Sequence, residues 1–300
     1  MTSKIKLTFL GTSAQIPTAK RNHSGILLNY KSENILIDCG EGTQRQFRKA
    51  RLNPCKITRI LITHWHGDHV FGLPGILSTL SFSNYRKEVY IYGPRGTKEF
   101  VKDLLKLFNF QKNFKIIAEN VSGKFFENEE FYLEAEKMKH GIPVNSYNFV
   151  IKDKLRIDKK KLIKSKIPVG KHLTDLQKGK DVVVDGKKYK SKDLTYLEKG
   201  KKISFVLDTL RNDKIVPFVK NADVFVSESS FSSENAKEAK EHLHLTAEQA
   251  GQIAKKAKVK KLILTHISQR YEKNLKGLLE DAKKNFKNVQ IVKDLDVVEI

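Results

Sequence analysis

The stretch Ile57-Thr-Arg-Ile-Leu-Ile-Thr63, followed at once by His64-Trp-His-Gly-Asp-His69, is the most informative part of the sequence. Its first half is rich in β-branched and apolar residues and predicts a buried strand. Its second half supplies three histidines and one aspartate within six residues. Neutral imidazoles and a carboxylate suit Zn²⁺, and Gly67 allows the chain to turn between the ligand pairs. We therefore predict a metal site at the carboxyl end of this strand.

Further ligands are expected where other predicted strands end. Asp208 follows the strand Ile203–Leu207, His266 ends the strand Lys261–Thr265, and His140 precedes a Gly-Ile-Pro turn. Paired metal ions in hydrolytic sites lie roughly 3.5–4 Å apart and can share a carboxylate, a role that suits Asp208. A lone histidine is more often structural, so it is the placement at strand ends that makes Asp208 and His266 candidates.

The remaining pattern alternates short strands with helices. The segments Gly25–Tyr30 and Asn34–Asp38 predict a hairpin, and Thr246-Ala-Glu-Gln249 predicts a capping box at a helix start. Strands with interleaved helices in both halves of the chain indicate two sheets covered by helices. We expect an α/β fold whose core comprises residues 1–150 and 203–300.

The chain is strongly basic. Among its 300 residues are 57 Lys and Arg against 34 Asp and Glu, a formal net charge of +23. We interpret this excess as a surface for nucleic acid, the alternative being a solvated Lys-rich surface. No apolar run approaches the roughly 18–20 residues of a membrane span. Two cysteines, Cys39 and Cys55, without metal-clip spacing, favour a reduced, cytoplasmic protein.

The basic residues concentrate in residues 151–202, which hold 18 Lys and Arg against 7 Asp and Glu. The segment contains several turn signals and few large apolar residues. It could be a loose basic insertion, or an arm that projects from the core and binds phosphates. The concentration of charge favours the arm.

Several motifs together resemble a known family. His64–His69 after its strand is typical of the metallo-β-lactamase superfamily. Within it, Asp38-Cys-Gly-Glu-Gly-Thr-Gln44, Gly72-Leu-Pro-Gly75, Pro17-Thr-Ala-Lys-Arg-Asn22 and His244-Leu-Thr246 resemble the short form of tRNase Z, or ribonuclease Z. That family removes 3′ trailers from precursor tRNA, leaving a 3′ hydroxyl on the tRNA and a 5′ phosphate on the trailer. The resemblance implies an αββα sandwich with a protruding basic arm at residues 151–202.

The resemblance also implies roles for individual residues. His64, His66 and His140 would hold one Zn²⁺, Asp68, His69 and His266 a second, and Asp208 would bridge the two. Mn²⁺ or Fe²⁺ would accept the same ligands. Asp38 would orient the ligand loops without binding metal. Asp68, His244 and Glu228 would be catalytic, with His244 and Glu228 acting as a proton relay.

The expected partners are a precursor tRNA and, by resemblance, a second copy of the chain in a homodimer, with no membrane. The arm would bind the tRNA elbow, and the loop that contains Lys20, Arg21 and Asn22 would sense a 3′ CCA end. The RNA-binding residues expected from this comparison are Lys20, Arg21, Asn22, Lys164, Lys166, Lys171, Lys178 and Lys180.

Two other functions are compatible with parts of the sequence. A small-molecule hydrolase of the same superfamily, such as a thioesterase or lactonase, would use the same metal motif but would leave the basic arm without a role. A nucleic-acid-binding protein with a structural metal would explain the charge. Structural zinc sites, however, are mostly closed and rich in cysteine, unlike this His and Asp set.

Overall fold

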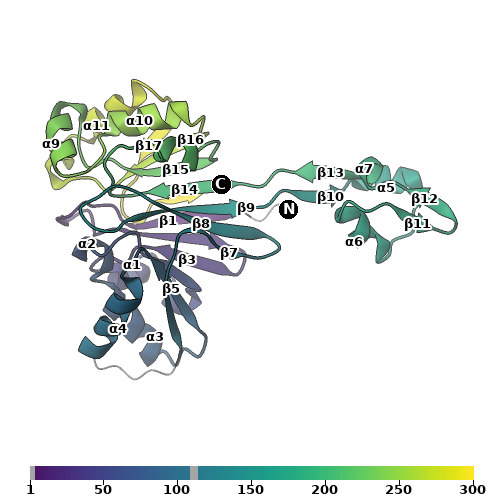
Figure 1. The fold of residues 1–300 in the computed structure, drawn as a ribbon, viewed down its shortest axis with the longest axis horizontal. Coiled ribbons are helices and arrows are strands. Elements are labelled where there is room, and N and C mark those ends of the chain that lie inside the picture. The colour runs from purple at the N-terminus through teal and green to yellow at the C-terminus, as the bar shows by residue number, and fades with distance from the viewer. Residues whose placement is uncertain (1–3, 109–113) are drawn as a thin grey trace.

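The computed structural model describes residues 4–108 and 114–300 and consists of a sandwich with one projection (Figure 1). Two seven-stranded sheets lie face to face. Helices cover the outer side of each sheet, and the projection leaves the sandwich at one end (Figure 1).

The first sheet contains the first and the last strand of the chain, which pair with each other. Its outer part is antiparallel and includes the predicted hairpin of β2 and β3, while β3, β4, β5 and β6 are parallel. The predicted strand at Ile57–Thr63 is shorter than expected, because its pairing with both neighbours covers only three residues. The order across the sheet is β18 (Val297–Glu299), β1 (Ile5–Gly11), β2 (Gly25–Tyr30), β3 (Glu33–Ile37), β4 (Arg59–Leu61), β5 (Val89–Gly93) and β6 (Ile116–Asn120).

The second sheet repeats this plan. Its β14 to β17 are parallel, and β14, β9, β8 and β7 are antiparallel. The order is β17 (Val289–Ile291), β16 (Lys261–Thr265), β15 (Val224–Glu228), β14 (Lys202–Val206), β9 (Asn145–Ile151), β8 (Phe131–Lys137) and β7 (Gly123–Glu127).

The core is divided into layers because side chains alternate along a strand. In β16, Ile263 packs between the two sheets, whereas Leu262 and Leu264 pack under the outer helices. In β3, Leu36 likewise faces the helices of its own side. This arrangement confirms the predicted αββα sandwich.

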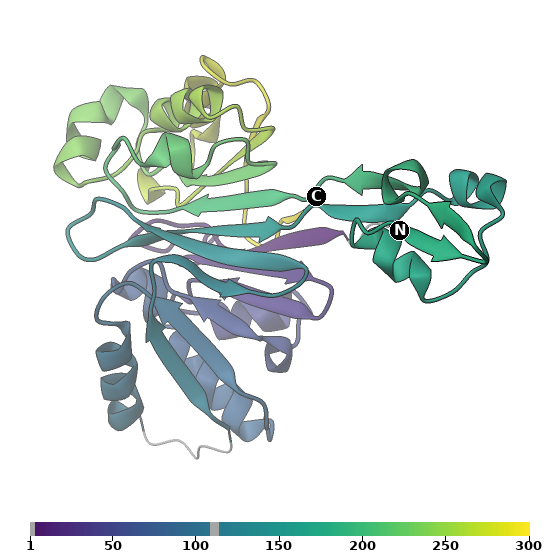
Figure 2. The same cartoon turned by 45° about the vertical axis from the view of Figure 1, so that its right-hand side comes forward.

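Helices of each half cover their own sheet (Figure 2). The capping box predicted at Thr246 is present, with Gln249 as its partner. On the first sheet lie α1 (Thr43–Lys49), α2 (Gly67–Val70), α3 (Leu73–Phe82) and α4 (Thr97–Leu107). On the second lie α8 (Ile215–Phe218), α9 (Ala236–Glu241), α10 (Ala247–Lys256) and α11 (Leu275–Lys283), and short 3₁₀ turns are η1 (Pro54–Lys56), η2 (Ser233–Asn235) and η3 (Gln269–Tyr271).

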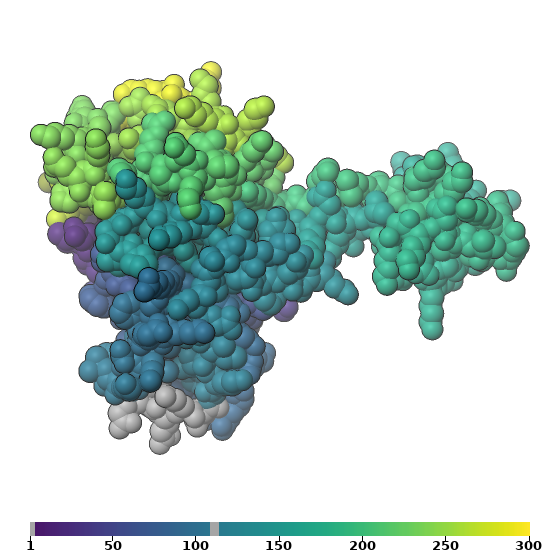
Figure 3. Space-filling model, viewed as in Figure 1, coloured from purple at the N-terminus to yellow at the C-terminus, as the bar shows by residue number. Residues whose placement is uncertain are grey.

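The projection is a folded arm that leaves the sandwich after β9 and returns at β14 (Figure 3). Its stalk is the antiparallel ribbon of β10 (Lys154–Ile157) and β13 (Thr195–Glu198). Its head has a small core around Ile167, Leu176 and Leu194 and is therefore an ordered unit. The head contains α5 (Lys159–Ser165), α6 (His172–Gln177), β11 (Val182–Val184), β12 (Lys187–Tyr189) and α7 (Ser191–Leu194). Within the described ranges, none of the helices combines the length and hydrophobicity required to span a bilayer.

Candidate metal centre

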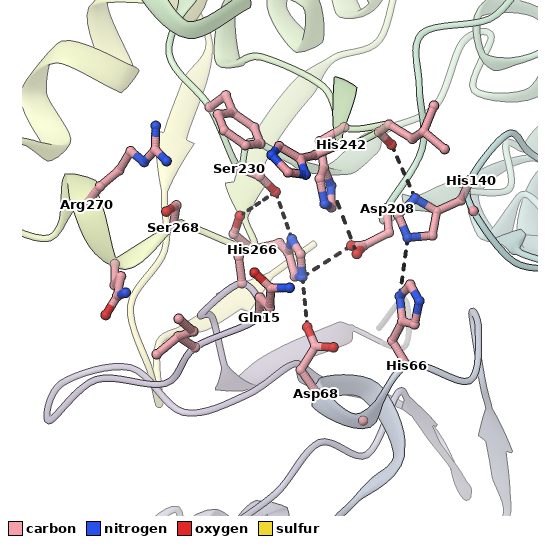
Figure 4. A pocket seen from close by; sticks show the side chains of 18 of the residues that line it. Gln15, His66, Asp68, His140, Asp208, Ser230, His242, His266, Ser268 and Arg270 are labelled. Carbon is pink, nitrogen blue, oxygen red and sulfur yellow. Dashed lines mark hydrogen bonds and ion pairs between the residues drawn. The ribbon is translucent and has the colours of Figure 1, made fainter. Parts of the chain in front are cut away.

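Five of the seven candidate ligands, His66, Asp68, His140, Asp208 and His266, line a cavity of about 760 Å³ at one edge of the sandwich (Figure 4), and His64 and His69 are fully buried. All seven come from loops that follow strands of both sheets. The loop after β4 supplies His64 to His69, the loop after β8 supplies His140, and the ends of β14 and β16 supply Asp208 and His266. The carboxyl ends of parallel strands face one edge, which is why residues distant in sequence meet here.

One ligand cluster contains His64, His66 and His140. His66 Nδ1 lies 3.0 Å from His64 Nε2 and 3.3 Å from His140 Nε2. His64 is fully buried, whereas the other two are nearer the opening.

A second cluster contains Asp68, His69 and His266. His69 Nε2 lies 3.3 Å from His266 Nε2 and 3.2 Å from Asp68 Oδ2. Asp208 lies between the two clusters: its Oδ2 is 3.6 Å from His64 Nε2 and 3.6 Å from His69 Nε2. The structure thus brings together all seven residues that the sequence indicated as ligands.

Hydrogen bonds outside the clusters select the ring tautomers. Asp38 accepts from His69 Nδ1 at 2.7 Å and Thr63 Oγ1 accepts from His64 Nδ1 at 3.1 Å. Thr63 Oγ1 in turn donates to Asp38 Oδ2 at 2.8 Å, so it must accept from His64. In the neutral form of each ring the proton therefore stays on Nδ1 and a bare Nε2 faces the centre, as in metal-binding histidines.

His266 and His140 follow the same pattern, whereas His66 turns its Nδ1 toward the cluster. His266 Nδ1 donates to Ser230 Oγ at 2.9 Å, and Ser230 Oγ donates to Glu228 Oε2 at 2.7 Å. His140 Nδ1 donates to the carbonyl oxygen of Leu243 at 3.3 Å. Ser230 is a contributor that sequence reasoning missed, although its position two residues after Glu228 was a usable signal.

Three residues of the site, two aspartates and one histidine, have backbone conformations that are rare for non-glycine residues. Asp38, Asp208 and His266 have positive φ angles of 56°, 31° and 56°. Non-glycine residues rarely adopt such angles, and they persist where surrounding contacts impose them, commonly at functional sites. At Asp38, the backbone amide donates to Leu61 and the side chain accepts from the Thr63 amide.

The donor set fits divalent metal ions. Asp208 Oδ1 is buried without a hydrogen-bond partner among the residues that the structure describes, and it lies 3.2 Å from His266 Nε2. Because the His266 proton is on Nδ1, two lone pairs face each other there. Bare imidazole nitrogens and carboxylate oxygens at such distances repel unless a cation lies between them.

Burial and charge act differently on the candidate ligands: at His69 burial opposes protonation, but the carboxylates of Asp38, Asp208 and Asp68 outweigh it and raise the pKa well above its usual value. Burial lowers the pKa of His64 well below its usual value and lowers that of His66, so both rings are neutral. Burial opposes ionisation of Asp208, but His266 and His69 hold the pKa of that carboxyl well below its usual value. Neutral imidazole and ionised carboxylate are the forms that bind metal.

His244 lies beside the clusters and is hydrogen-bonded to an acidic partner. Its Nδ1 donates to Glu228 Oε2 at 2.9 Å and is 4.0 Å from Asp208 Oδ2. Burial opposes protonation, but Glu228 and then Asp208 raise the pKa of His244 to about 9. Glu228 is fully buried and also accepts from the Thr209 amide at 2.7 Å, which fixes its orientation.

Of the three loop residues expected to contact RNA, one is buried. Lys20 is exposed, but Arg21 is only 4% exposed, and its Nη1 donates to Thr12 Oγ1 and to the carbonyl oxygen of Val292. Arg21 therefore faces the interior, where its hydrogen bonds hold the loop in place. Nearby carboxylates compensate for the burial of its charge. The Asn22 side chain donates to the carbonyl oxygen of Glu41.

The five arm lysines named from the sequence are all exposed on the head. They are Lys164, Lys166, Lys171, Lys178 and Lys180. Three others were missed: Lys188, Lys190 and Lys192 line a second cavity of about 600 Å³ beside the stalk. Lys188 lies in β12, Lys190 directly after it and Lys192 in α7, so the change from strand to helix, which local sequence did not indicate, brings them to one cavity.

The sequence of this chain is similar to those of known proteins. A family model described as Anti-Pycsar protein Apyc1 matches residues 5–163. The ribonuclease Z of Listeria welshimeri is 40% identical over 308 aligned residues that cover 99% of each chain.

Two solved structures resemble the whole chain. Human tRNase Z, short form, has a TM-score of 0.72 and 28% identity, covering 98% of each chain. The metallo-β-lactamase fold protein YhfI of Bacillus subtilis has a TM-score of 0.73 at 20% identity, covering 99% of this chain and 100% of its own, a likeness in fold. The chain therefore belongs, over residues 5–163, to the family that the Apyc1 description names and, over its whole length, to the ribonuclease Z family.

Proposed function

We propose that this protein is a metal-dependent endoribonuclease that removes the 3′ trailer from precursor tRNA in the cytoplasm. The observation that carries the proposal is the position of Asp208 between two histidine clusters, with the His244–Glu228 pair beside it. A scissile phosphate needs charge neutralisation on one side and a proton for its leaving oxygen on the other.

The ligand sets would hold two Zn²⁺ ions, with Mn²⁺ or Fe²⁺ as alternatives. His64, His66 and His140 would hold one, Asp68, His69 and His266 the other, and Asp208 would contact both. When bound, such ions supply an activated water and neutralise phosphate charge. The buried partners Asp38, Thr63 and Ser230 orient the rings, as their hydrogen bonds indicate.

The proton for the leaving group would come from His244. Glu228 holds the ring through Nδ1, which leaves Nε2 to donate to the 3′ oxygen of the tRNA. In the metal-free protein the pKa of His244, raised to about 9, keeps the ring protonated at neutral pH, the form that a general acid requires. The tRNA would then keep a 3′ hydroxyl and the trailer a 5′ phosphate.

The arm would bind the folded part of the tRNA. It projects away from the sandwich, and its exposed lysines suit phosphate contacts (Figure 3). In a homodimer, the arm of one subunit would present tRNA to the site of the other. A small-molecule hydrolase would use the same metal centre but would give the arm no role, so it is the less favoured function.

The decisive experiment is cleavage of one precursor tRNA with mapping of the cut, beside a nitrophenyl phosphodiester and a thioester. We expect a single cut at the trailer junction with the stated end groups and more than one metal ion per chain. Hydrolysis of the thioester alone would favour the small-molecule hydrolase. Binding of tRNA without cleavage would favour a binding protein with a structural metal.

A further inference from the structure

One wall of the cavity carries side chains that neither the ligand sets nor the proton relay uses. Phe231 follows β15, His242 lies directly after α9, and Arg270 lies in η3. These three come from separate loops and meet on the side of the cavity next to His244. Figure 4 shows His242 and Arg270 on the opposite side of Asp208 from His66 and His140.

The three side chains are stacked in a defined way. The His242 ring is parallel to the Phe231 ring, with an interplanar angle of 2° and centroids 6.2 Å apart. The Arg270 guanidinium lies 5.3 Å from the same centroid. Phe231 is only 7% exposed, so it acts as a fixed support for two groups that are themselves exposed to the cavity.

The charge of Arg270 is already compensated. Its Nη1 and Nη2 donate to Glu238 Oε2 and Oε1 at 2.6 and 2.9 Å. The two hydrogen bonds hold the guanidinium plane, so Arg270 offers the cavity a flat face more than a free charge. Exposed imidazole and guanidinium planes are the surfaces on which unstacked RNA bases pack.

The distance of this wall from His244 indicates which nucleotide the wall would contact. The Phe231 ring centroid is 5.9 Å from that of His244 and 6.2 Å from that of His242. In the proposed reaction, His244 protonates the 3′ oxygen that remains on the tRNA. The ribose bearing that oxygen would then lie against His244, and the wall of Phe231, His242 and Arg270 is the aromatic surface next to it.

We infer that His242, supported by Phe231 and flanked by Arg270, forms a stacking site for the base of the last tRNA nucleotide, the one that receives the new 3′ hydroxyl. This inference rests on the proposed function. Every base has a flat face, so the site accepts any base at this position. Its contribution is to orient the leaving ribose toward His244.

The test combines a variant with a substrate that lacks the base. Wild type and His242→Ala are compared on a precursor tRNA and on the same RNA with an abasic residue at the last tRNA position. Stacking on one base is worth about 1–3 kcal/mol, so either single change should lower kcat/KM about 5- to 150-fold. The two changes together should lower it no further than one.

Controls separate stacking from damage to the site. His242→Phe restores the flat face and should recover kcat/KM, and Phe82→Ala removes an exposed aromatic on α3 and should change nothing. Metal content and melting temperature of His242→Ala should match wild type.

Equal losses for His242→Ala on intact and abasic RNA would overturn the inference, as would an unchanged kcat/KM on intact RNA. Either result would leave the proposed function standing. If wild type cut neither RNA, the proposed function itself would fail.

Discussion

His69 Nδ1 donates a 2.7 Å hydrogen bond to Asp38 Oδ2, and neither side chain has any exposed surface. Asp38 also accepts from the amide and hydroxyl of Thr63, so a residue outside the ligand sets orders both histidine clusters. The ligand loops are therefore held from behind by one buried carboxylate.

Asp38→Asn should weaken metal binding about 10- to 100-fold. Both carboxylate oxygens of Asp38 accept, Oδ1 from the Thr63 amide and Oδ2 from the Thr63 hydroxyl and His69, so an asparagine would place an NH2 donor against at least one of these donors. Competition with a chromophoric chelator measures the change. Asp223→Asn is the matched control, because Asp223 is a largely buried carboxylate that binds Lys202 and Lys260 away from the cavity. Equal metal affinity in Asp38→Asn and wild type would contradict the role given to Asp38.

Asp68→Ala should reduce precursor tRNA cleavage to background while leaving tRNA binding within a few-fold of wild type. The carboxylate lies among the ligand atoms of the second cluster, whereas binding is assigned to the arm. Gel-shift and cleavage assays on the same RNA give the two quantities. Asp213→Ala, an exposed carboxylate outside the cavity, serves as the control. Loss of binding in Asp68→Ala would show that the roles have been misassigned.

His244→Ala should slow tRNA cleavage by about 10²- to 10⁴-fold, the usual contribution of a general acid. Hydrolysis of bis(p-nitrophenyl) phosphate should fall much less, because nitrophenolate leaves without a proton. Single-turnover rates on both substrates provide the comparison. Equal losses on both, together with lower metal content, would mean that His244 is a metal ligand instead.

Glu228→Gln should lower the pKa of His244 in the metal-free protein. Burial opposes protonation of this histidine, and Glu228 is the main group that raises its pKa to about 9. A raised pKa means that the protonated pair stabilises the metal-free fold fully below pH 6.5 and loses that effect as the pH rises through about 9. NMR titration of the ring measures the pKa.

The free energy of unfolding offers a second measurement of the same pair. The difference between wild type and Glu228→Gln should shrink from pH 6.5 to above pH 9. The hydrogen bonds from Thr209 and Ser230 to Glu228 do not titrate in this range and leave a constant remainder. A His244 pKa that is the same in both proteins would refute the coupling.

Replacing residues 158–194 with a two-residue Asn-Gly turn should spare hydrolysis of a small phosphodiester and cripple cleavage of precursor tRNA. The stalk strands are paired at Ile157 and Thr195, and Asp158 bonds Leu194, so a tight turn can close the ribbon. Binding by wild type should weaken steeply with salt, and the shortened protein should lose most of that dependence. Equal loss on both substrates would indicate that the arm is part of the catalytic core.

Local sequence predicted much of the metal centre. The strand before His64 and the spacing of the following ligands lie within one short segment, so their arrangement depends on few long-range contacts. Asp208 and His266 could be singled out because each follows a predicted strand, and parallel strands end at one edge. The hairpin of β2 and β3 and the capping box at Thr246 are also confirmed, because each is formed by residues close together in the sequence.

Other features could not be predicted from local patterns. The sequence places Arg21 in a basic surface loop, yet the side chain is buried and donates to Thr12 and to Val292, and Val292 lies in a distant part of the chain. The stack of His242, Phe231 and Arg270 likewise requires three loops to meet.

By itself, the sequence determined the types of candidate ligand, their spacing after a buried strand, and the concentration of positive charge in one inserted segment. These are properties of neighbouring residues. Only the tertiary structure decided that Asp208 lies between both clusters, that Arg21 is buried, and that the arm projects from the sandwich as an ordered unit. Those outcomes depend on how two sheets pack and which strand ends they bring to one edge, which no single segment of the chain encodes.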